Sequence, residues 1–193
     1  MSLFLGIDTS NYTTSVAVIA SDGRVIQKKR LLPVKAGERG IRQSDAVFHH
    51  TKAYPELLED LMKAVSEPIS AVGVSISPTT EEGSYMPCFL VGESVATALS
   101  SVLNVPLFKF SHQQGHIAAA LYSANKTELF SGKFIAFHIS GGTTDAVLCE
   151  CGNNTMKITP VASSNDLKAG QAVDRIGVKM GLLFPCGKEL EKL

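Results

Sequence analysis

The chain carries no excess of either charge, with 18 lysine and arginine residues against 18 aspartate and glutamate residues. A neutral chain has no overall electrostatic attraction to nucleic acid, so any RNA binding must depend on a local patch or a partner protein. The sequence also lacks an apolar run close to the roughly 20 residues that a membrane-spanning helix needs. Residues 1–8 contain no basic region, and their apolar run is too short for a signal peptide. We therefore expect a cytoplasmic protein without membrane association.

Two motifs that would indicate particular metal chemistry are missing. The four cysteines, Cys88, Cys149, Cys151 and Cys186, form no Cys-x-x-Cys pair. Cys149 and Cys151 would share one face of a strand, which is the wrong geometry for most zinc knuckles, so we interpret all four as small buried thiols. A His-Glu-x-x-His helix is also absent, so a metalloprotease would lack its general-base glutamate.

The order of secondary-structure elements indicates an α/β protein. With 45% apolar and 19% charged residues, the chain is too apolar to be disordered, and 193 residues suffice for one domain or one and a part. Apolar periodicity distinguishes strands from helices. The expected strands are 3–9, 13–20, 24–32, 71–77, 105–110, 134–140, 143–150 and 156–162, and the expected helices are 48–65, 89–103, 111–123 and 167–181. This order, βββαβαβα and then βββα, predicts mixed sheets covered by helices.

The second set of strands repeats the first in its residues as well as in its order. Without a gap, the coinciding residues are Phe4, Ser10, Thr13 and Thr14 with Phe134, Ser140, Thr143 and Thr144. Such an internal duplication resembles the actin-like (ribonuclease H-like) ATPases and sugar kinases, which bind nucleotide between two α/β lobes. We therefore expect a complete first lobe over residues 1–125 and the first half of a second lobe over residues 126–193.

Each copy places a turn of small residues between its first two strands, at residues 10–14 and 140–144. Successive backbone N–H groups in such a turn can hold an anion, and glycine lets a ligand approach the backbone closely. A plain hairpin turn is the alternative for either copy alone. Two copies that face each other across a cleft would be typical of a phosphate site.

A histidine pair opens the helix expected at residues 111–123. His112 and His116 are four residues apart, so both imidazoles project from one face, which is a metal-ligand spacing. Ser111 is the expected N-cap, with Gln114 as its capping-box partner. The alternative is a pair of histidines that only form hydrogen bonds at a helix start. A metal site would need a third ligand, and no carboxylate of the chain is an obvious match.

The last expected helix carries Asp174 beside an apolar stripe of Val173, Ile176 and Met180, which we expect to be buried. Asn165 and Asp166 can cap this helix. Asp174 either borders a cleft or is a solvated aspartate paired with Arg175 or Lys168. His49 and His50 are adjacent on a helix, so they cannot both serve one site from one face, and we interpret them as mainly structural or as groups that support the ligands of a site.

Several motifs at matching distances resemble the TsaD family, also called Gcp. Its members are tRNA adenosine threonylcarbamoyltransferases, formerly named O-sialoglycoprotein endopeptidases or glycoproteases. The motifs are His112-x-x-x-His116 after Asn104-Val-Pro, then Ser140-Gly-Gly-Thr-Thr, Ala169-Gly-Gln-Ala-Val-Asp-Arg and Gly181-Leu-Leu-Phe-Pro-Cys-Gly. The resemblance covers essentially the whole chain and corresponds to the N-terminal part of a longer protein.

The resemblance implies a metal site and a nucleotide site. His112 and His116 would bind one iron or zinc ion, and the family's remaining ligand is an aspartate near its C-terminus. An ATP- or AMP-type nucleotide, or threonylcarbamoyl-adenylate, would be bound by residues of the turn and of the last helices. These residues are Ser140, Gly141, Gly142, Thr143 and Thr144 for phosphate, Asp174 for ribose, and Gly187 and Glu191 at further nucleotide-contacting positions.

The chain departs from the family where loops face the substrate. The family's Glu-Thr-Ser-Cys-Asp-Glu-Thr is here Asp8-Thr-Ser-Asn-Tyr-Thr-Thr, and its Gly-Pro-Gly-Leu is Ser77-Pro-Thr-Thr. We therefore interpret the chain as a divergent paralogue. The leading hypothesis is metal-dependent threonylcarbamoyl transfer to adenosine N6 of tRNA, with TsaB-like partner proteins that hold the tRNA.

Three other functions stay open. The first is an ATP-dependent kinase or ATPase, for which Asp8 or Asp145 would be the catalytic carboxylate. The second is the historical glycoprotease, and the third is a non-enzymatic scaffold lobe like TsaB. We expect this stretch of chain to be inactive alone and, because a half-built lobe exposes apolar strands, to form a homodimer.

Overall fold

The computed structural model describes residues 2–10, 12–33, 41–139, 143–153, 155–184 and 186–193. The chain divides into two compact units, Met1–His116 and Ile117–Leu193, and the boundary lies inside helix α3 (His112–Ser123). The expected domain limit between residues 125 and 126 stays a prediction. Among the described residues, no helix is long and apolar enough to cross a membrane.

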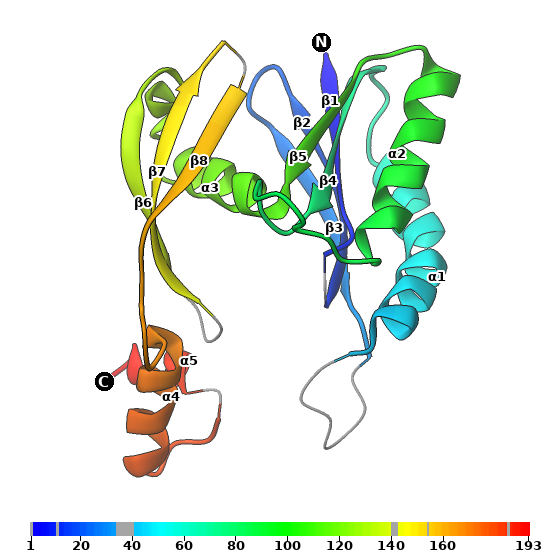
Figure 1. Cartoon of the computed structure of the whole chain (residues 1–193). Coiled ribbons are helices and arrows are strands. Elements are labelled where there is room, and N and C mark those ends of the chain that lie inside the picture. Colours follow the sequence, from blue (N-terminus) through cyan, green and yellow to red (C-terminus); the bar gives the residue numbers. More distant parts are fainter. Residues whose placement is uncertain (1, 11, 34–40, 140–142, 154, 185) are drawn as a thin grey trace. The chain divides into compact units, whose positions relative to one another are not determined.

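The first unit is built on a mixed five-stranded sheet (Figure 1). Its strands are β1 (Leu3–Asp8), β2 (Thr13–Ala20), β3 (Val25–Leu31), β4 (Ile69–Ser77) and β5 (Leu107–Ser111), in the spatial order β3-β2-β1-β4-β5. The first three form an antiparallel meander, whereas β4 is parallel to β1 and β5 is parallel to β4. The expected βββαβαβ order of this region is confirmed.

Alternation along the strands decides which face of this sheet carries the core. Leu5 and Ile7 of β1 and Val16 of β2 are buried on one face, where helices α1 (Gln43–Met62) and α2 (Phe89–Leu103) cover them. Leu61 of α1 and Ala96 of α2 belong to the same buried cluster. The period of two in the strands and the wider spacing in the helices therefore meet in one core.

Two predicted elements have the observed bounds, and a third does not. The strand at residues 13–20 and the helix at residues 89–103 coincide with β2 and α2. Helix α1 begins at Gln43 rather than at residue 48, because Ala46 packs with Leu32 and Phe89 in a separate buried cluster. That cluster joins segments distant in the sequence, so helical periodicity alone does not reveal it.

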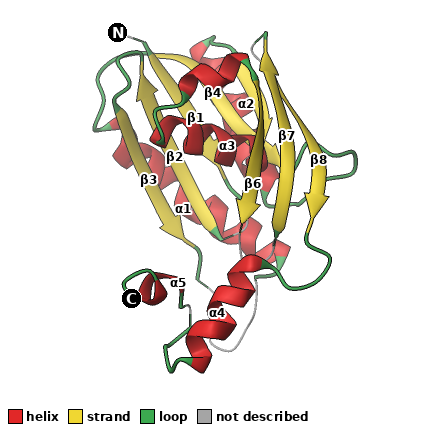
Figure 2. Cartoon of the chain, turned by 90° about the vertical axis from the view of Figure 1, so that its left-hand side faces the viewer, coloured by secondary structure: helices red, strands yellow, loops and turns green. Residues whose placement is uncertain are grey.

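The second unit is a three-stranded antiparallel meander with short helices (Figure 2). Its strands are β6 (Lys133–Ile139), β7 (Thr144–Gly152) and β8 (Thr155–Ser163), and its other elements are η1 (Thr127–Ser131), α4 (Ala169–Lys179) and α5 (Gly187–Leu190). Ile117 and Leu121, in the C-terminal part of α3, pack with Val147, Cys149 and Ile158 on one face of the sheet.

Strand register supports the internal duplication. In the first hairpin, Phe4 is paired with Ile19 and Asp8 with Ser15. In the second, Phe134 is paired with Cys149 and His138 with Asp145, so each pair recurs with both numbers raised by 130. A hairpin's register depends on its turn and on its alternation of apolar residues, so equal registers indicate that the same number of residues joins the strands of each hairpin.

Helix α4 differs from its prediction in two ways. The expected apolar stripe is exposed rather than buried, with Val173 at 40%, Ile176 at 56% and Met180 at 56% exposure. The expected cap at residues 165–166 is also wrong, because the N-cap is Lys168 and forms no side-chain cap. Instead, the Ala169 N–H donates to the hydroxyl of Thr144 at 2.8 Å, so a tertiary contact satisfies the helix start.

The cysteines are free thiols, and three of them, Cys88, Cys149 and Cys186, are buried as expected. Cys151 is half-buried and packs beside Cys149. Burial raises the pKa of the Cys149 thiol to about 11, and the neighbouring Cys151 adds to the shift. A raised pKa disfavours the thiolate, so Cys149 fits the predicted role of a small core side chain.

Candidate functional site

The histidine pair lies at the start of α3, and the chain around it folds as the capping pattern predicts. The Gln114 N–H donates to the Ser111 hydroxyl at 3.2 Å, and the Ser111 N–H donates to the Gln114 side-chain oxygen at 2.7 Å. This reciprocal pair satisfies helix-start donors and confirms the predicted capping box. The Gln113 N–H donates to the carbonyl of Pro78, which ties the same turn to the end of β4.

The two imidazoles contact each other on one face of α3. The ring centroids of His112 and His116 are 4.2 Å apart, with the edge of one ring toward the other. His112 also lies near Phe89, at 6.3 Å between ring centroids. The spacing of four residues therefore places two potential metal donors side by side, as the sequence predicts.

Asp8 joins this pair from the end of β1. Its Oδ2 lies 2.8 Å from Nδ1 of His112, which follows 104 residues later in the chain. Its Oδ1 accepts the Ser10 N–H at 2.8 Å. Sequence reasoning considered Asp8 only as a kinase carboxylate and missed this contact. No local pattern could have revealed it, because the partners are brought together only by the sheet order β1-β4-β5.

The environment of Asp8 keeps its carboxylate ionised. Burial by itself raises the pKa of this carboxyl. Hydrogen bonds with His112, Ser10 and Ser75 and the electrostatic attraction of His112 outweigh burial, so the pKa lies well below its usual range. The first unit therefore presents a fixed negative charge directly beside the histidine pair.

This donor set fits part of a metal site. Within the described residues, no group of three or more histidine, cysteine, aspartate or glutamate side chains is arranged to hold an ion. His112 and His116 fit as two imidazole ligands, and a carboxylate beside one ring is the usual neighbour of a metal-binding histidine.

The other adjacent histidines do not belong to this group. His50 is fully buried, and its Nδ1 lies 2.7 Å from the hydroxyl of Thr14. His49 packs its ring against Phe48. The interpretation of His50 as a structural residue therefore agrees with its position in the core of the first unit.

The predicted phosphate turn is only partly described, because Ser140, Gly141 and Gly142 lie outside the described residues. Thr143 places its hydroxyl 3.4 Å from Nδ1 of His138. The Thr144 hydroxyl donates to the Thr143 carbonyl and accepts the N–H of Ala169. Thr144 therefore connects the end of the turn to the first residue of α4.

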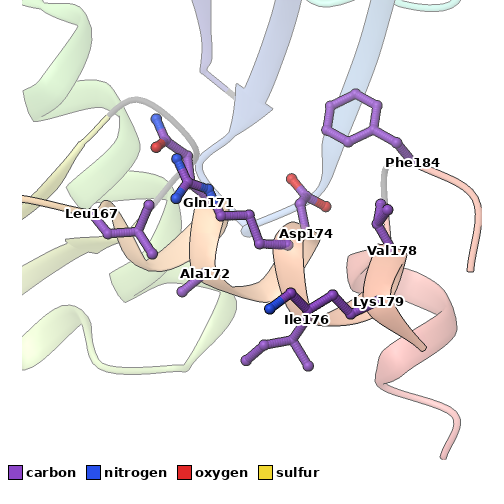
Figure 3. A pocket seen from close by; sticks show the side chains of 9 residues that line it. Leu167, Gln171, Ala172, Asp174, Ile176, Val178, Lys179 and Phe184 are labelled. Atoms are coloured by element: carbon purple, nitrogen blue, oxygen red, sulfur yellow. The ribbon is translucent and has the colours of Figure 1, made fainter. Parts of the chain in front are cut away.

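Asp174 lines an open pocket of the second unit that runs along α4 (Figure 3). Gln171, Asp174 and Phe184 project on one side of this helix, whereas Ala172 and Ile176 project on the other. Asp174 Oδ1 accepts the Cys186 N–H at 2.8 Å, just before α5. The ion pairs between described residues do not include Asp174, so neither Arg175 nor Lys168 neutralises it.

Gly187 is the first residue of α5, directly after Cys186, and Glu191 is the C-cap of this short helix. This helix packs closely on α4 at Gly177, where a Cβ atom would lie 2.3 Å from Cβ of Cys186. Asp174, Gly187 and Glu191 therefore come from neighbouring elements of one unit. Their role in nucleotide binding stays a prediction.

The order β3-β2-β1-β4-β5, followed by a second meander in the same register, defines an actin-like ATPase fold. A solved structure described as YeaZ from Pseudomonas aeruginosa agrees, with a TM-score of 0.50 and 16% identity over 88% of this chain and 68% of that one. This likeness concerns the fold. The predicted fold class is confirmed.

A narrower assignment comes from sequence comparison. The family model described as "TsaD: tRNA N6-adenosine threonylcarbamoyltransferase" matches residues 25–193, and the chain belongs to this family. Proteins named tRNA N6-adenosine threonylcarbamoyltransferase are similar to it: one from Methanopyrus kandleri is 27% identical, covering 98% of this chain and 53% of its own length. One from Pediococcus pentosaceus is 31% identical, covering 100% and 54%. The chain therefore spans about half the length of these relatives.

Proposed function

We propose that the protein transfers a threonylcarbamoyl group from threonylcarbamoyl-adenylate to N6 of adenosine in tRNA, so that the bond to AMP breaks, AMP leaves, and N6 loses a proton. The observation that carries this proposal is the His112–His116 pair, held beside Asp8 in a chain that belongs to the TsaD family. The alternative of a nucleotide-dependent kinase leaves this pair without an explanation.

His112 and His116 would supply two imidazole ligands to one iron or zinc ion. Such an ion, when bound, acts as a Lewis acid that polarises the carbonyl of threonylcarbamoyl-adenylate. The ordered start of α3 would hold both rings in place through the Ser111–Gln114 capping box. Asp8 contributes a negative charge beside them, which favours a bound cation.

The second unit would hold the AMP part of the adenylate. Residues 140–144 would surround the phosphate with backbone N–H groups, and the Thr144 hydroxyl, occupied by Thr143 and Ala169, would keep the turn in shape. One oxygen of Asp174 holds the turn at Cys186, which leaves its other oxygen to accept a ribose hydroxyl. Gly187 and Glu191 would contact the same nucleotide.

Partners are part of this proposal because the chain has no net charge. We assign tRNA binding largely to TsaB-like partner proteins, which the family resemblance implies. The likeness in fold to YeaZ is consistent with association between related lobes. This chain by itself would then be inactive.

The alternative kinase or ATPase activity has weaker support. Of its two candidate carboxylates, Asp8 is engaged by His112, and Asp145 accepts the hydroxyl of Ser163 at 2.6 Å. A carboxylate that positions a nucleophile at a γ-phosphate must face the ligand. Calorimetric titration of ATP in the presence of Mg²⁺, with and without iron, separates the functions, because iron-independent ATP turnover would favour the kinase.

The decisive experiment measures threonylcarbamoyl transfer by the full-length protein, supplied with partner enzymes, threonylcarbamoyl-adenylate and tRNA. We expect modified adenosine with the natural protein. We expect His112→Ala and His116→Ala to lower the rate at least about 100-fold, since an ion held by one imidazole binds weakly. Mass spectrometry of digested tRNA gives the readout.

His49→Ala is the matched control, because it also removes one imidazole. The ring of His49 packs on Phe48 of α1 and not on the histidine pair. It should transfer at the natural rate. Absence of transfer by the natural protein would overturn the proposed function, and full activity of His112→Ala would overturn the role of the histidine pair.

A further inference from the structure

Asp8 contacts a ring nitrogen of His112 directly, in addition to placing a negative charge beside the histidine pair. Both carboxylate oxygens have defined partners: Oδ1 accepts the backbone N–H of Ser10, and Oδ2 faces Nδ1 of His112 at 2.8 Å. Ser75 of β4 adds a side-chain hydrogen bond. The Asp8 side chain is 23% exposed and that of His112 is 34% exposed, so the contact is partly shielded from water.

The hydrogen-bond partner of Nδ1 decides which ring nitrogen of His112 carries the proton. An ionised carboxylate only accepts hydrogen bonds, so the nitrogen that faces it must carry a proton. For a neutral imidazole, a proton on Nδ1 leaves the lone pair on Nε2. The arrangement therefore selects one tautomer of His112, and in that tautomer Nε2 is the atom able to bind a cation.

We propose that Asp8 is a positioning residue that fixes the Nδ1–H tautomer of His112 and so presents Nε2 as a metal ligand beside His116. This inference rests on the proposed function, since it assigns Asp8 a role in the same site. Metal-binding histidines commonly donate their second ring N–H to a carboxylate, and loss of that carboxylate commonly lowers metal affinity 10- to 100-fold.

The Asp8→Asn variant tests this role because the Ser10 N–H fixes which way the new amide group points. The Ser10 N–H can only donate, so it keeps the amide oxygen of the new side chain on its own side. The amide NH2 group then faces His112 and donates to Nδ1, which moves the ring proton to Nε2. The variant should keep the fold and present the wrong tautomer.

The first measurement needs no metal. In the metal-free protein labelled with 15N-histidine, two-bond nitrogen–proton NMR correlations report the tautomer of each ring, and His112→Ala assigns the signal of His112. We expect Nδ1–H in the natural protein and Nε2–H in Asp8→Asn. An Nε2–H tautomer in the natural protein would overturn the inference, whether or not the variant folds.

The second measurement is a zinc titration of the full-length protein against a coloured chelator. We expect Asp8→Asn to weaken zinc binding about 10- to 100-fold. Asp8→Glu, which restores an ionised acceptor, should recover most of that loss. Asp22→Asn is the matched control, because Asp22 lies in an exposed turn where its carboxylate accepts the Arg24 N–H, and its zinc affinity should be unchanged.

The outcomes separate the two proposals. A natural protein that binds no zinc or iron would overturn the metal site of the proposed function. The tautomer of His112 measured in metal-free protein would still show whether Asp8 fixes the Nδ1–H form. Equal zinc affinity of Asp8→Asn and the natural protein would overturn the positioning role even if transfer activity is found.

Discussion

Gly92 shows how one residue sets the distance between a helix and the strand that carries Asp8. The buried Thr9 hydroxyl donates to the Cys88 carbonyl at 2.9 Å and accepts the Gly92 N–H at 3.1 Å. A Cβ atom at Gly92 would lie 2.9 Å from Thr9 Oγ1. The absence of a side chain therefore lets α2 approach the end of β1.

We expect Gly92→Ala to lower the free energy of unfolding by about 1–3 kcal/mol, because the added methyl group must displace Thr9. This loss should exceed the gain of about 1 kcal/mol that alanine brings to a helix interior. Urea unfolding followed by circular dichroism measures the difference.

Gly115→Ala is the matched control in another helix. Its nearest non-neighbouring atom, Ser75 Oγ, would be 4.0 Å from the new Cβ atom, which is an ordinary contact. This variant should be as stable as the natural protein or slightly more stable. Equal stability of the two variants would contradict the close-approach explanation for Gly92.

At the scale of elements, the start of α3 shows how local chemistry holds a functional group. The Ser111–Gln114 pair is encoded within four consecutive residues, so it can be predicted from the sequence, and it is present in the structure. The start of α4 is the opposite case. Its first N–H is satisfied by Thr144, a residue of another element, so a search for a local cap identified the wrong residues.

We expect Ser111→Ala to lower the free energy of unfolding by about 0.5–2 kcal/mol, since it removes the N-cap hydroxyl of α3. Thermal and urea unfolding measure the change. Ser101→Ala provides the control, because Ser101 is exposed on α2 and its hydroxyl donates only within its own helix, to Thr97. A loss no larger than that of the control would show that the capping box contributes little.

At the scale of the whole molecule, the second unit leaves an apolar strand face open. Ile135, Phe137 and Ile139 of β6 are 48%, 72% and 61% exposed. In the first unit, the matching residues Leu5 and Ile7 are buried beneath helices. By analogy with the first unit, the side chains on this face of β6 are of the kind that other elements cover in a complete lobe.

We expect the chain of 193 residues to self-associate through this face, because contiguous exposed apolar side chains promote association. Size-exclusion chromatography with light scattering should detect a dimer or a larger assembly, and Phe137→Glu should shift it toward monomer. Val102→Glu alters an exposed apolar residue of α2 and should not. A natural chain that is monomeric at all concentrations would contradict the prediction.

The sequence by itself determined the features that neighbouring residues encode. Alternation of apolar side chains predicted β2 and the two matching hairpins, helical spacing predicted α2 and the histidine pair, and the repeat predicted the duplicated fold. These features depend on residues a few positions apart, or on direct comparison of two segments.

Only the tertiary structure decided which distant groups meet. It placed Asp8 beside His112 and the Thr144 hydroxyl where it accepts the first N–H of α4. It also left the apolar residues of α4 exposed. Such contacts depend on the order of strands in a sheet and on the packing of elements, and no local period in the sequence records them. The spacing of the two histidines can therefore be predicted from the sequence. The contact between Asp8 and His112 forms only when the strand order of the sheet brings these residues together.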